Sequence, residues 1–181
     1  MIIGLFGVAG VGKTTFTNKL KESFPVLLRF SASELIKELN GEVEYKKLRE
    51  TDVINNQQKL CLAINNIAER DLQKNIIIEL HNIIETQGEP IFVDRFTLLN
   101  LKLDKVYFIK KKPSLIVSNR NNDTKVRAIL DSYQITLLQE KALKYFEEVY
   151  YHLDREVISG TDEDLRNIIN FLKFENKKST S

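Results

Sequence analysis

Five short apolar runs recur along the chain, at residues 2–6, 26–30, 76–80, 105–109 and 156–159. Each run has the length of a buried strand, and segments with helical periodicity lie between them. Strands that alternate with helices predict a parallel sheet with helices on both faces. In such a sheet, right-handed crossovers bring the strand-to-helix loops that matter to one edge, at the carboxyl ends of the strands.

Residues 82–100 interrupt this alternation. The runs 83–86 and 91–93 are strand-like and flank Gln87-Gly88-Glu89-Pro90, which predicts a small hairpin. Residues 40–56 are polar and predict a loop between two helices. A hairpin inserted after the third strand would hang over the carboxyl edge of the sheet. Two irregular insertions at that edge indicate a place for a second substrate.

Three helix boundaries follow from local chemistry. Pro113 suits the first turn of a helix that runs to Arg120. Thr161 with Asp164 resembles a capping box that opens the last helix. An apolar seam between them predicts a long helix over residues 134–152.

Length and composition bound the functional classes. A chain of 181 residues fits one domain, over residues 1–181, and its net charge of +2 gives no sign of a nucleic-acid partner. The single cysteine, Cys61, excludes a disulfide framework or a cysteine metal site. No apolar run reaches membrane-spanning length, so a cytoplasmic location without membrane contact is expected. Whether the chain forms a homo-oligomer stays open.

The most informative motif directly follows the first apolar run. It reads G-x-x-x-x-G-K-[ST], the phosphate-binding loop (P-loop). The loop comprises Gly7, Val8, Ala9, Gly10, Val11, Gly12, Lys13, Thr14 and Thr15. Its glycines let backbone N–H groups turn around a polyphosphate. Lys13 supplies charge for the β- and γ-phosphates, Thr14 is placed to ligate Mg²⁺, and the helix that follows adds its dipole. Strand, loop and helix together predict binding of a nucleoside triphosphate.

A carboxylate at a strand end is the second chemical signal. Glu79 closes the third apolar run and would lie beside the P-loop, where it can hold the water shell of Mg²⁺ as a Walker B acid does. The alternative is a structural hydrogen bond that satisfies a buried acid. His81 follows two residues later and either contacts substrate or serves as a capping or surface histidine.

A mixed basic cluster follows the helix after the fourth strand. It contains Arg120, Asp123, Lys125 and Arg127 around Asn121-Asn122. Because a transferring phosphoryl group spreads negative charge over its oxygens, arginines at a helix–loop–helix corner suit a closing lid. The alternative is a solvated charged face.

Three further charged segments have two interpretations each. Lys46, Lys47 and Arg49 either bind the phosphate of an acceptor or form a solvated run. Asp94-Arg95 is either an acid–arginine pair that faces a nucleotide or a surface ion pair. The lysine triplet 110–112 lacks exposed aromatic neighbours, so we interpret it as a solvated run beside a helix rather than a nucleic-acid patch.

Taken in order, these residues resemble the archaeal-type adenylate kinases, which are P-loop nucleoside monophosphate kinases. The resemblance runs from residue 1 to roughly residue 170. The matching positions are the P-loop, Glu79-Leu80-His81, Ile84, Thr86, Asp104, Arg120, Asp123, Arg127, Ile135, Gln139, Ala142 and Tyr145. The chain departs from the family at Glu79, where an Asp is expected, and before Leu48, where the family has Arg and this chain has lysines. The stretch Val93-Asp94-Arg95-Phe96 is instead similar to thymidylate kinases and deoxynucleoside kinases.

The resemblance implies an α/β, three-layer P-loop NTPase fold with a five-stranded parallel sheet and a small lid. It implies Mg²⁺-dependent phosphoryl transfer from ATP to a nucleoside monophosphate, with AMP foremost. The implied roles are catalysis by Lys13, Arg120 and Arg127, metal binding by Thr14 and Glu79, ATP-base contact near Gly160, and substrate binding by Lys46, Arg49, His81, Asp94 and Arg95. Three alternatives remain: a thymidylate or deoxynucleoside kinase, a P-loop ATPase that acts as an assembly factor, and a nucleotide-binding regulatory module without turnover.

Overall fold

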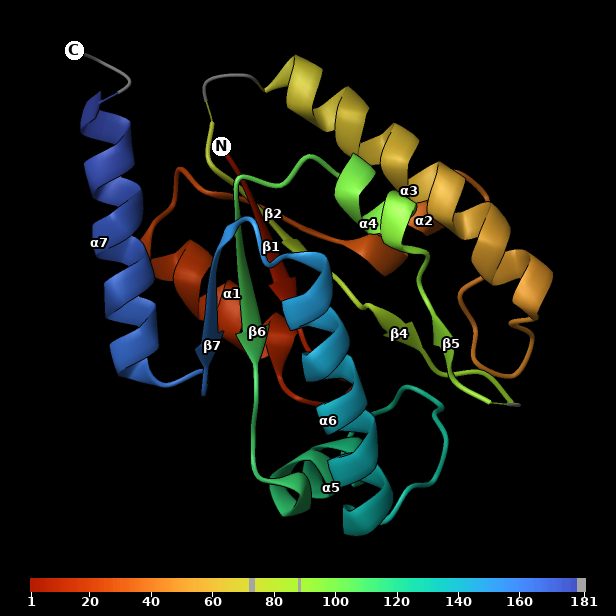
Figure 1. Cartoon of the computed structure of the whole chain (residues 1–181). Coiled ribbons are helices and arrows are strands. Elements are labelled where there is room, and N and C mark those ends of the chain that lie inside the picture. Colours follow the sequence, from red (N-terminus) through yellow and green to blue (C-terminus); the bar gives the residue numbers. More distant parts are fainter. Residues whose placement is uncertain (72–73, 88, 179–181) are drawn as a thin grey trace.

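A five-stranded parallel sheet forms the centre of the protein (Figure 1). The computed structural model describes residues 1–71, 74–87 and 89–178. The strands are β1 (Ile2–Phe6), β2 (Leu28–Ser31), β3 (Ile76–Glu79), β6 (Lys105–Ile109) and β7 (Asp154–Ile158), in the spatial order β2-β3-β1-β6-β7. All neighbouring strands are parallel. The predicted α/β fold with five parallel strands is therefore confirmed.

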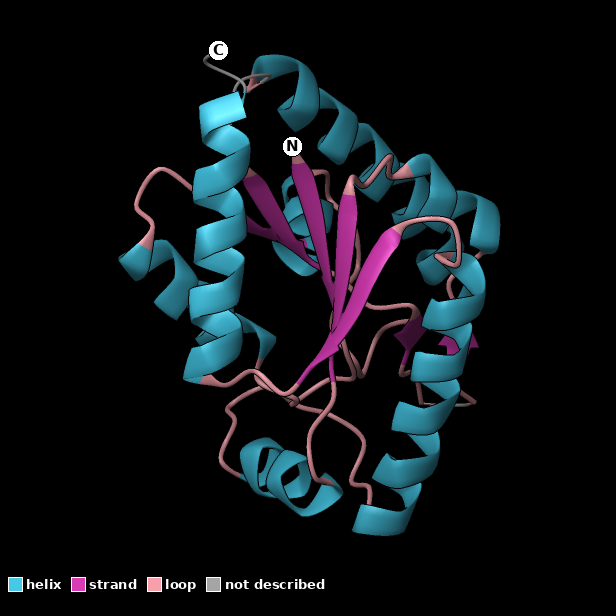
Figure 2. Ribbon diagram, turned by 60° about the vertical axis from the view of Figure 1, so that its left-hand side comes forward, coloured by secondary structure: helices cyan, strands magenta, loops and turns pink. Residues whose placement is uncertain are grey.

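Helices cover both faces of the sheet. They are α1 (Lys13–Ser23), α2 (Ala32–Glu38), α3 (Glu50–Arg70), α4 (Arg95–Asn100), α5 (Pro113–Asn121), α6 (Ser132–Val149) and α7 (Asp162–Lys178). In Figures 1 and 2, α1 and α7 lie on one face and α3, α4 and α6 lie on the other, while α5 lies beyond the carboxyl ends of the strands. Every strand-to-helix connection around β1 thus emerges at one edge, as the sequence predicts.

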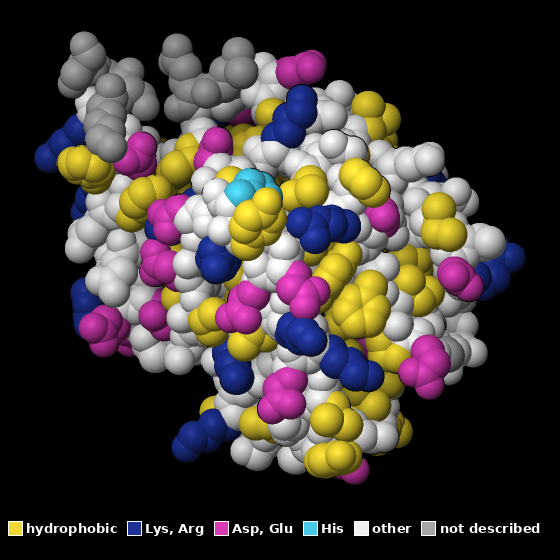
Figure 3. All heavy atoms as spheres, viewed as in Figure 1, with side chains coloured by type: hydrophobic (Ala, Val, Ile, Leu, Met, Phe, Trp, Pro, Cys, Tyr) yellow, Lys and Arg dark blue, Asp and Glu magenta, His cyan; other side chains and the backbone are white. Residues whose placement is uncertain are grey.

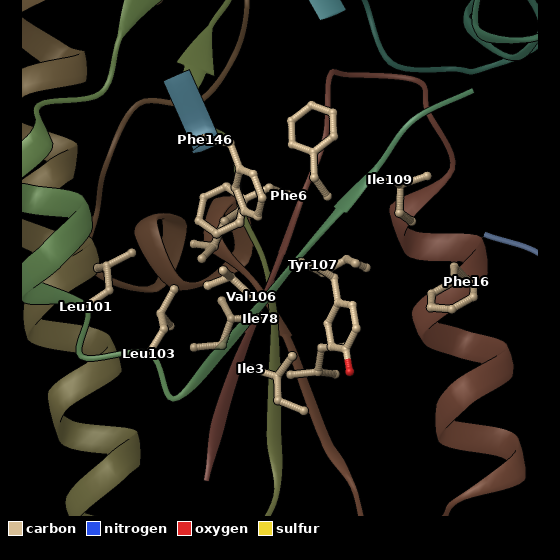
Figure 4. Close-up of a cluster of buried hydrophobic side chains, with 14 of the residues drawn as sticks. Ile3, Phe6, Phe16, Ile78, Leu101, Leu103, Val106, Tyr107, Ile109 and Phe146 are labelled. Carbon is tan, nitrogen blue, oxygen red and sulfur yellow. The ribbon is translucent and has the colours of Figure 1, made fainter. Parts of the chain in front are cut away.

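The core is apolar on both faces of the central strands. Every residue of β1 and of β6 is buried, which explains why both strands, apart from Lys105 at the start of β6, are continuous apolar runs rather than alternating ones. Figure 4 shows Tyr107 on the side of Phe16 and α1, and Val106 on the opposite side. On that opposite side, Phe146 of α6 packs with its ring centroid 5.5 Å from that of Phe6. The central strands are therefore held rigidly at the point where the P-loop begins.

The predicted hairpin is present at the carboxyl edge. β4 (Ile83–Ile84) and β5 (Ile91–Phe92) pair antiparallel, with Ile83 opposite Phe92. Gly88, in the predicted turn, lies outside the described residues. The hairpin is separate from the main sheet and lies beside α6 (Figure 1), where the Phe92 ring meets that of Tyr145 at 5.0 Å between centroids.

Two sequence predictions need correction. The runs 26–30 and 156–159 are predicted as buried strands, but β2 and β7 are the edge strands of the sheet, and only Ile158 of β7 is buried. Residues 50–56, predicted as loop, form the first turns of α3. The carboxylate of Asp52 accepts a hydrogen bond from the backbone N–H of Arg49 at 3.0 Å, so a local cap starts the helix within a polar segment.

Acidic and basic side chains are mixed on the surface. No helix among the described residues is long and apolar enough to cross a membrane. Figure 3 shows acidic and basic side chains interspersed over one face of the molecule, without a broad patch of either sign. This pattern agrees with the small net charge of +2.

Candidate active site

The P-loop connects β1 to α1 through left-handed backbone positions. Gly10 has φ of 83° and Gly12 has φ of 98°, a region that residues with a Cβ rarely adopt. At both positions a side chain from another segment lies close by. A Cβ on Gly10 would lie 2.5 Å from Cγ of Arg120, and one on Gly12 would lie 3.2 Å from Nζ of Lys111. The loop therefore needs glycine for its own turn and for the approach of two basic side chains.

Lys13 lies inside the loop and is only 7% exposed. Its ammonium donates to the carbonyl of Gly7 at 2.6 Å and to that of Val8 at 3.3 Å. Burial lowers the pKa of Lys13 to about 7, against the opposing attraction of Glu79. An anion held in the loop would raise this pKa again, because it favours the charged form. Lys13 is thus a cation prepared to gain its full charge when a phosphate arrives.

His81, which follows β3, lies beside Lys13. Its Nδ1 lies 3.5 Å from the Lys13 ammonium. Burial, followed by the charge of Lys13, holds the pKa of His81 well below its usual range, so the imidazole is neutral at pH 7. A neutral ring can accept a hydrogen bond from a cation or from a substrate hydroxyl without adding positive charge.

Glu79 is the hub of a buried hydrogen-bond network at the end of β3. Its Oε2 accepts from the hydroxyl of Thr14 at 2.6 Å, and its Oε1 accepts from Thr17 at 2.6 Å. Arg29 of β2 donates to the same Oε1 from Nε at 2.9 Å and lies 2.7 Å from it through Nη2. The acid is 5% exposed, and these partners satisfy it.

The Thr14–Glu79 pair fits a magnesium ion. A hydroxyl and a carboxylate oxygen that already meet at 2.6 Å are the hard oxygen ligands that Mg²⁺ prefers. No group of three or more His, Cys, Asp or Glu side chains that could hold a metal occurs among the described residues. An ion here would therefore take its remaining ligands from water and from nucleotide phosphates, as Mg²⁺ usually does.

Lys111 corrects the interpretation of the lysine triplet as a solvated run. Lys110 and Lys112 are exposed, but the Lys111 ammonium lies beside Gly12 and 3.6 Å from the place of a Cβ on Gly160. Gln139 of α6 fixes the Lys111 backbone, accepting from its N–H at 3.0 Å and donating to its carbonyl at 2.9 Å. Lys111 is therefore held between the P-loop and the loop after β7, where the sequence predicts contact with the ATP base.

Arg120 lies against the P-loop but is already fully engaged. Its guanidinium forms two parallel hydrogen bonds with Glu85, at 3.0 and 2.6 Å. The same group donates to the carbonyls of Ala9 at 3.4 Å and Ala128 at 2.8 Å. These four bonds use all the hydrogens of Nη1 and Nη2. In this arrangement the Nη groups have none left for a phosphate, so a catalytic role of Arg120 stays a prediction that requires a rearrangement.

Arg127 has the opposite property. Its Nη2 lies 2.6 Å from Asp123, while its Nη1 is buried and has no hydrogen-bond partner among the described residues. The positive charge of Arg127 acts on both Lys13 and His81 and lowers the pKa of each. The segment between α5 and α6, where the lid is predicted, thus carries a guanidinium whose charge acts on the P-loop lysine and whose Nη1 could still donate to a ligand.

The remaining predicted substrate residues lie away from the P-loop contacts. Lys46 and Arg49 line a cleft of about 490 Å³ together with hairpin residues that include Thr86, Gln87 and Ile91. Gln87 donates to the Lys46 carbonyl at 2.6 Å and joins the two walls. Asp94 caps α4, accepting from the N–H of Thr97 at 3.0 Å. Arg95 is exposed in the first turn of that helix.

Three site residues escape sequence reasoning: Arg29, Glu85 and Lys111. Arg29 could have been found, because an arginine in a strand run requires a carboxylate partner, and Glu79 is the acid at a neighbouring strand end. Glu85 carries a weaker signal, as an acid at the hairpin end opposite a basic cluster. Lys111 carries none, since only the fold distinguishes it from the two lysines beside it.

Comparisons with known proteins identify the family of the chain and solved structures with a similar fold. The profile of the AAA_17 family, described as "AAA domain", matches residues 6–148. No curated protein sequence matches the chain. Similar solved structures include shikimate kinase from Aquifex aeolicus (TM-score 0.62, 19% identity, 96% of each chain covered) and deoxyadenosine kinase from M. mycoides (TM-score 0.56, 14% identity, 96% of this chain and 99% of that one).

A third similar structure is the YorR protein from Bacillus subtilis in complex with phosphorylated GDP (TM-score 0.55, 21% identity, 98% of each chain covered). At these identities the likeness concerns the fold, which is that of P-loop kinases and extends over nearly the whole chain. The family match covers the P-loop, Glu79, the hairpin and the segment that carries Arg127. The chain therefore belongs to the AAA domain family AAA_17.

Proposed function

We propose that this protein transfers the γ-phosphoryl group of ATP, with Mg²⁺, to a small acceptor, of which AMP is the first candidate. The observation that carries the proposal is the Thr14–Glu79 hydrogen bond of 2.6 Å beside a buried Lys13. A loop for a triphosphate, an oxygen pair for a divalent cation and an adaptable ammonium group meet at one strand edge. Phosphoryl transfer depends mainly on such positioning and charge.

The donor side is supported by groups that converge on the loop. The first N–H groups of α1 point at the loop, and its dipole favours an anion there. Lys13 would exchange its bonds to the Gly7 and Val8 carbonyls for phosphate oxygens. Lys111, held between Gly12 and Gly160, would approach the donor from the outer side of the loop. Thr14 and Glu79 would hold Mg²⁺, which would supply positive charge against the charge that develops during the transfer.

Arg127 is the residue that we assign to the phosphoryl group in flight. Its buried Nη1 lacks a partner among the described side chains and backbone groups, and a buried donor of this kind is costly unless a ligand satisfies it. Its charge already reaches Lys13. A guanidinium that gains its hydrogen bond only when substrate is present stabilises the transition state more than the free enzyme.

The acceptor would lie between His81 and the hairpin. The neutral His81 could accept a hydrogen bond from the acceptor, and the cleft lined by Lys46 and Arg49 offers basic side chains for an acceptor phosphate. The resemblance to archaeal-type adenylate kinases favours AMP. The solved neighbours include kinases of shikimate and of a deoxynucleoside, so the assay must also offer acceptors without a phosphate.

The test is to incubate the protein with Mg-ATP and a panel of nucleoside monophosphates, nucleosides and small hydroxy acids, and to look for new phosphorylated products. A Lys13→Ala variant is the control and should retain its fold but lose transfer. ATP hydrolysis that no acceptor changes would instead indicate a P-loop ATPase. Tight ATP binding without any turnover would indicate a regulatory module, and either result would overturn the proposal.

A further inference from the structure

The Glu85–Arg120 ion pair joins segments that are far apart along the chain. Glu85 follows strand β4 of the hairpin, and Arg120 lies in the last turn of α5. Their side chains are 12% and 5% exposed, and the pair has the parallel two-bond geometry that gives arginine–carboxylate contacts their directionality. Neither residue is free to reorient without loss of two hydrogen bonds.

The same arginine also contacts the P-loop and the segment before α6. It donates to the Ala9 carbonyl inside the loop and to the Ala128 carbonyl beside Arg127. Its aliphatic stem lies so close to Gly10 that a Cβ there would approach its Cγ to 2.5 Å. One side chain therefore sets the spacing between the hairpin, the P-loop and the segment that carries Arg127.

Glu85 balances the buried positive charge of Arg120, so the contact depends on it. Arg120 is 8% exposed, and Glu85 is its one carboxylate partner among the ion pairs of the described residues. A buried arginine that loses its carboxylate keeps an uncompensated charge and tends to move toward water or toward another anion. Loss of Glu85 would thus release Arg120 from its bridging position.

We propose that Glu85 is a positioning residue, which acts through Arg120 to couple the acceptor-side hairpin to the P-loop and the Arg127 segment. The inference rests on the proposed function only in naming the two sides donor and acceptor. Occupation of the P-loop rigidifies the hairpin, and this response passes through the Glu85–Arg120 pair. Glu85 itself need not touch a substrate.

Hydrogen exchange provides the test, because it does not require turnover. The amides of Ile83, Ile84, Ile91 and Phe92 are followed with and without Mg-AMPPNP, a non-hydrolysable ATP analogue. We expect the wild type to slow exchange at the P-loop and at the hairpin when the analogue binds. Glu85→Gln should retain the P-loop response and lose the hairpin response. An unresponsive wild-type hairpin, or an unchanged response in Glu85→Gln, would overturn the proposal.

Two further variants separate coupling from stability. Lys105→Met removes another buried cation that contacts carboxylates, but it lies on β6 away from the site and should keep the full hairpin response. Arg120→Met should also lose the hairpin response, and the double variant Glu85→Gln/Arg120→Met should behave like either single variant. A response that is smaller in the double variant than in each single variant would show that Glu85 acts independently of Arg120, against the proposal. Transfer by the wild type is measured separately, so failure of the kinase proposal is recognised on its own.

Discussion

At the scale of the residue, the site depends on two basic side chains, one of which gains charge and the other a hydrogen bond when a ligand binds. Lys13 is buried with its pKa lowered to about 7, and Arg127 holds one buried guanidinium nitrogen without a partner in the described part of the chain. Both groups gain from an anion. Glu79, in contrast, already has its partners in Thr14, Thr17 and Arg29. The network around Glu79 is therefore the fixed part of the site, and the two cations are its responsive part.

The lowered pKa of Lys13 predicts that ATP affinity falls as the pH rises. Below pH 7 the free lysine is already charged, so binding is at full strength. Above pH 7 it must take up a proton, because the bound phosphates raise its pKa, and affinity should fall by up to about tenfold per pH unit. Calorimetry between pH 6.5 and 8.5 in two buffers of different ionisation enthalpy measures both affinity and proton uptake. Lys13→Met is the control, and a parallel pH profile for this variant would contradict the prediction.

Arg127→Ala should separate catalysis from binding. Since Arg127 is assigned to the transferring group alone, we expect kcat to fall by about 10²- to 10³-fold while the KM for ATP changes by less than about threefold. Steady-state kinetics on the acceptor found in the panel assay provide the measurement. Arg155→Ala, on the exposed strand β7, is the matched arginine control. Equal losses in kcat and in ATP affinity would mean that Arg127 simply binds the nucleotide.

The sequence permits prediction of those site residues whose role follows from local pattern. The P-loop and Glu79 belong to one strand–loop–helix unit and to one strand end, so their neighbourhood can be inferred from topology, and the Thr14–Glu79 contact agrees with it. The contacts of Glu85 and Lys111 could not be predicted, because their partners lie on segments whose relative placement depends on packing. The different partners of Arg120 and Arg127 could not be predicted for the same reason, although the sequence predicts a basic cluster that contains both.

At the scale of the element, the central strands are easy to predict because they are buried throughout. The bounds of the edge strands are harder to predict, because many of their residues are exposed. β1 is a continuous apolar run and β6 is one after Lys105, whereas β7 starts with Asp154-Arg155-Glu156, two residues before the apolar run that predicts it. The missed start of β7 has a physical basis. Lys105 of β6, which is 7% exposed, pairs with Asp154 at 2.6 Å and with Glu156 at 2.7 Å. The start of β7 can therefore consist of charged residues, because two of them pair with Lys105 on the neighbouring strand β6.

This pairing predicts an asymmetry between two sets of substitutions. Asp154→Asn with Glu156→Gln would leave a buried Lys105 unpaired and should lower the free energy of unfolding by about 3–5 kcal/mol. Lys105→Met leaves two acids that are 63% and 51% exposed, and these can be hydrated, so its cost should be smaller, about 1–2 kcal/mol or less. Urea denaturation of both variants measures the difference. Equal costs would contradict this asymmetry.

At the scale of the whole molecule, the site is assembled from most of the chain. Residues from β1, α1, β2, β3, the hairpin, α5 and the segment before α6 meet at one sheet edge. Ligand binding at that edge should therefore be transmitted to global stability. The parallel sheet and the shared edge of its strand-to-helix loops could be predicted from the sequence, because alternating strands and helices require right-handed crossovers. The order of the strands, β2-β3-β1-β6-β7, could not be predicted from that alternation. The packing of the hairpin against α6 could not be predicted.

Mg-AMPPNP should raise the melting temperature of the whole protein. At a concentration of about 100 times its Kd, a ligand that binds only the folded state adds about 2.7 kcal/mol, which corresponds to roughly 5–11 °C for a chain of this size. Thermal denaturation with EDTA in place of Mg²⁺ should show a smaller shift, because Thr14 and Glu79 then lack their ion. The same shift in Lys13→Met as in the wild type would argue against binding at the P-loop.

The exposed edge of β7 also affects how copies of this protein meet. No strand of the described chain pairs along its outer side, and such an edge could accept a further strand. A second molecule that docked antiparallel about Arg155 would place Asp154 opposite Glu156 and Arg155 opposite its own counterpart. Like charges directly opposite one another disfavour strand pairing. Asp154 and Glu156, which pair with Lys105 inside the sheet, therefore also disfavour the edge-to-edge strand pairing from which fibres grow.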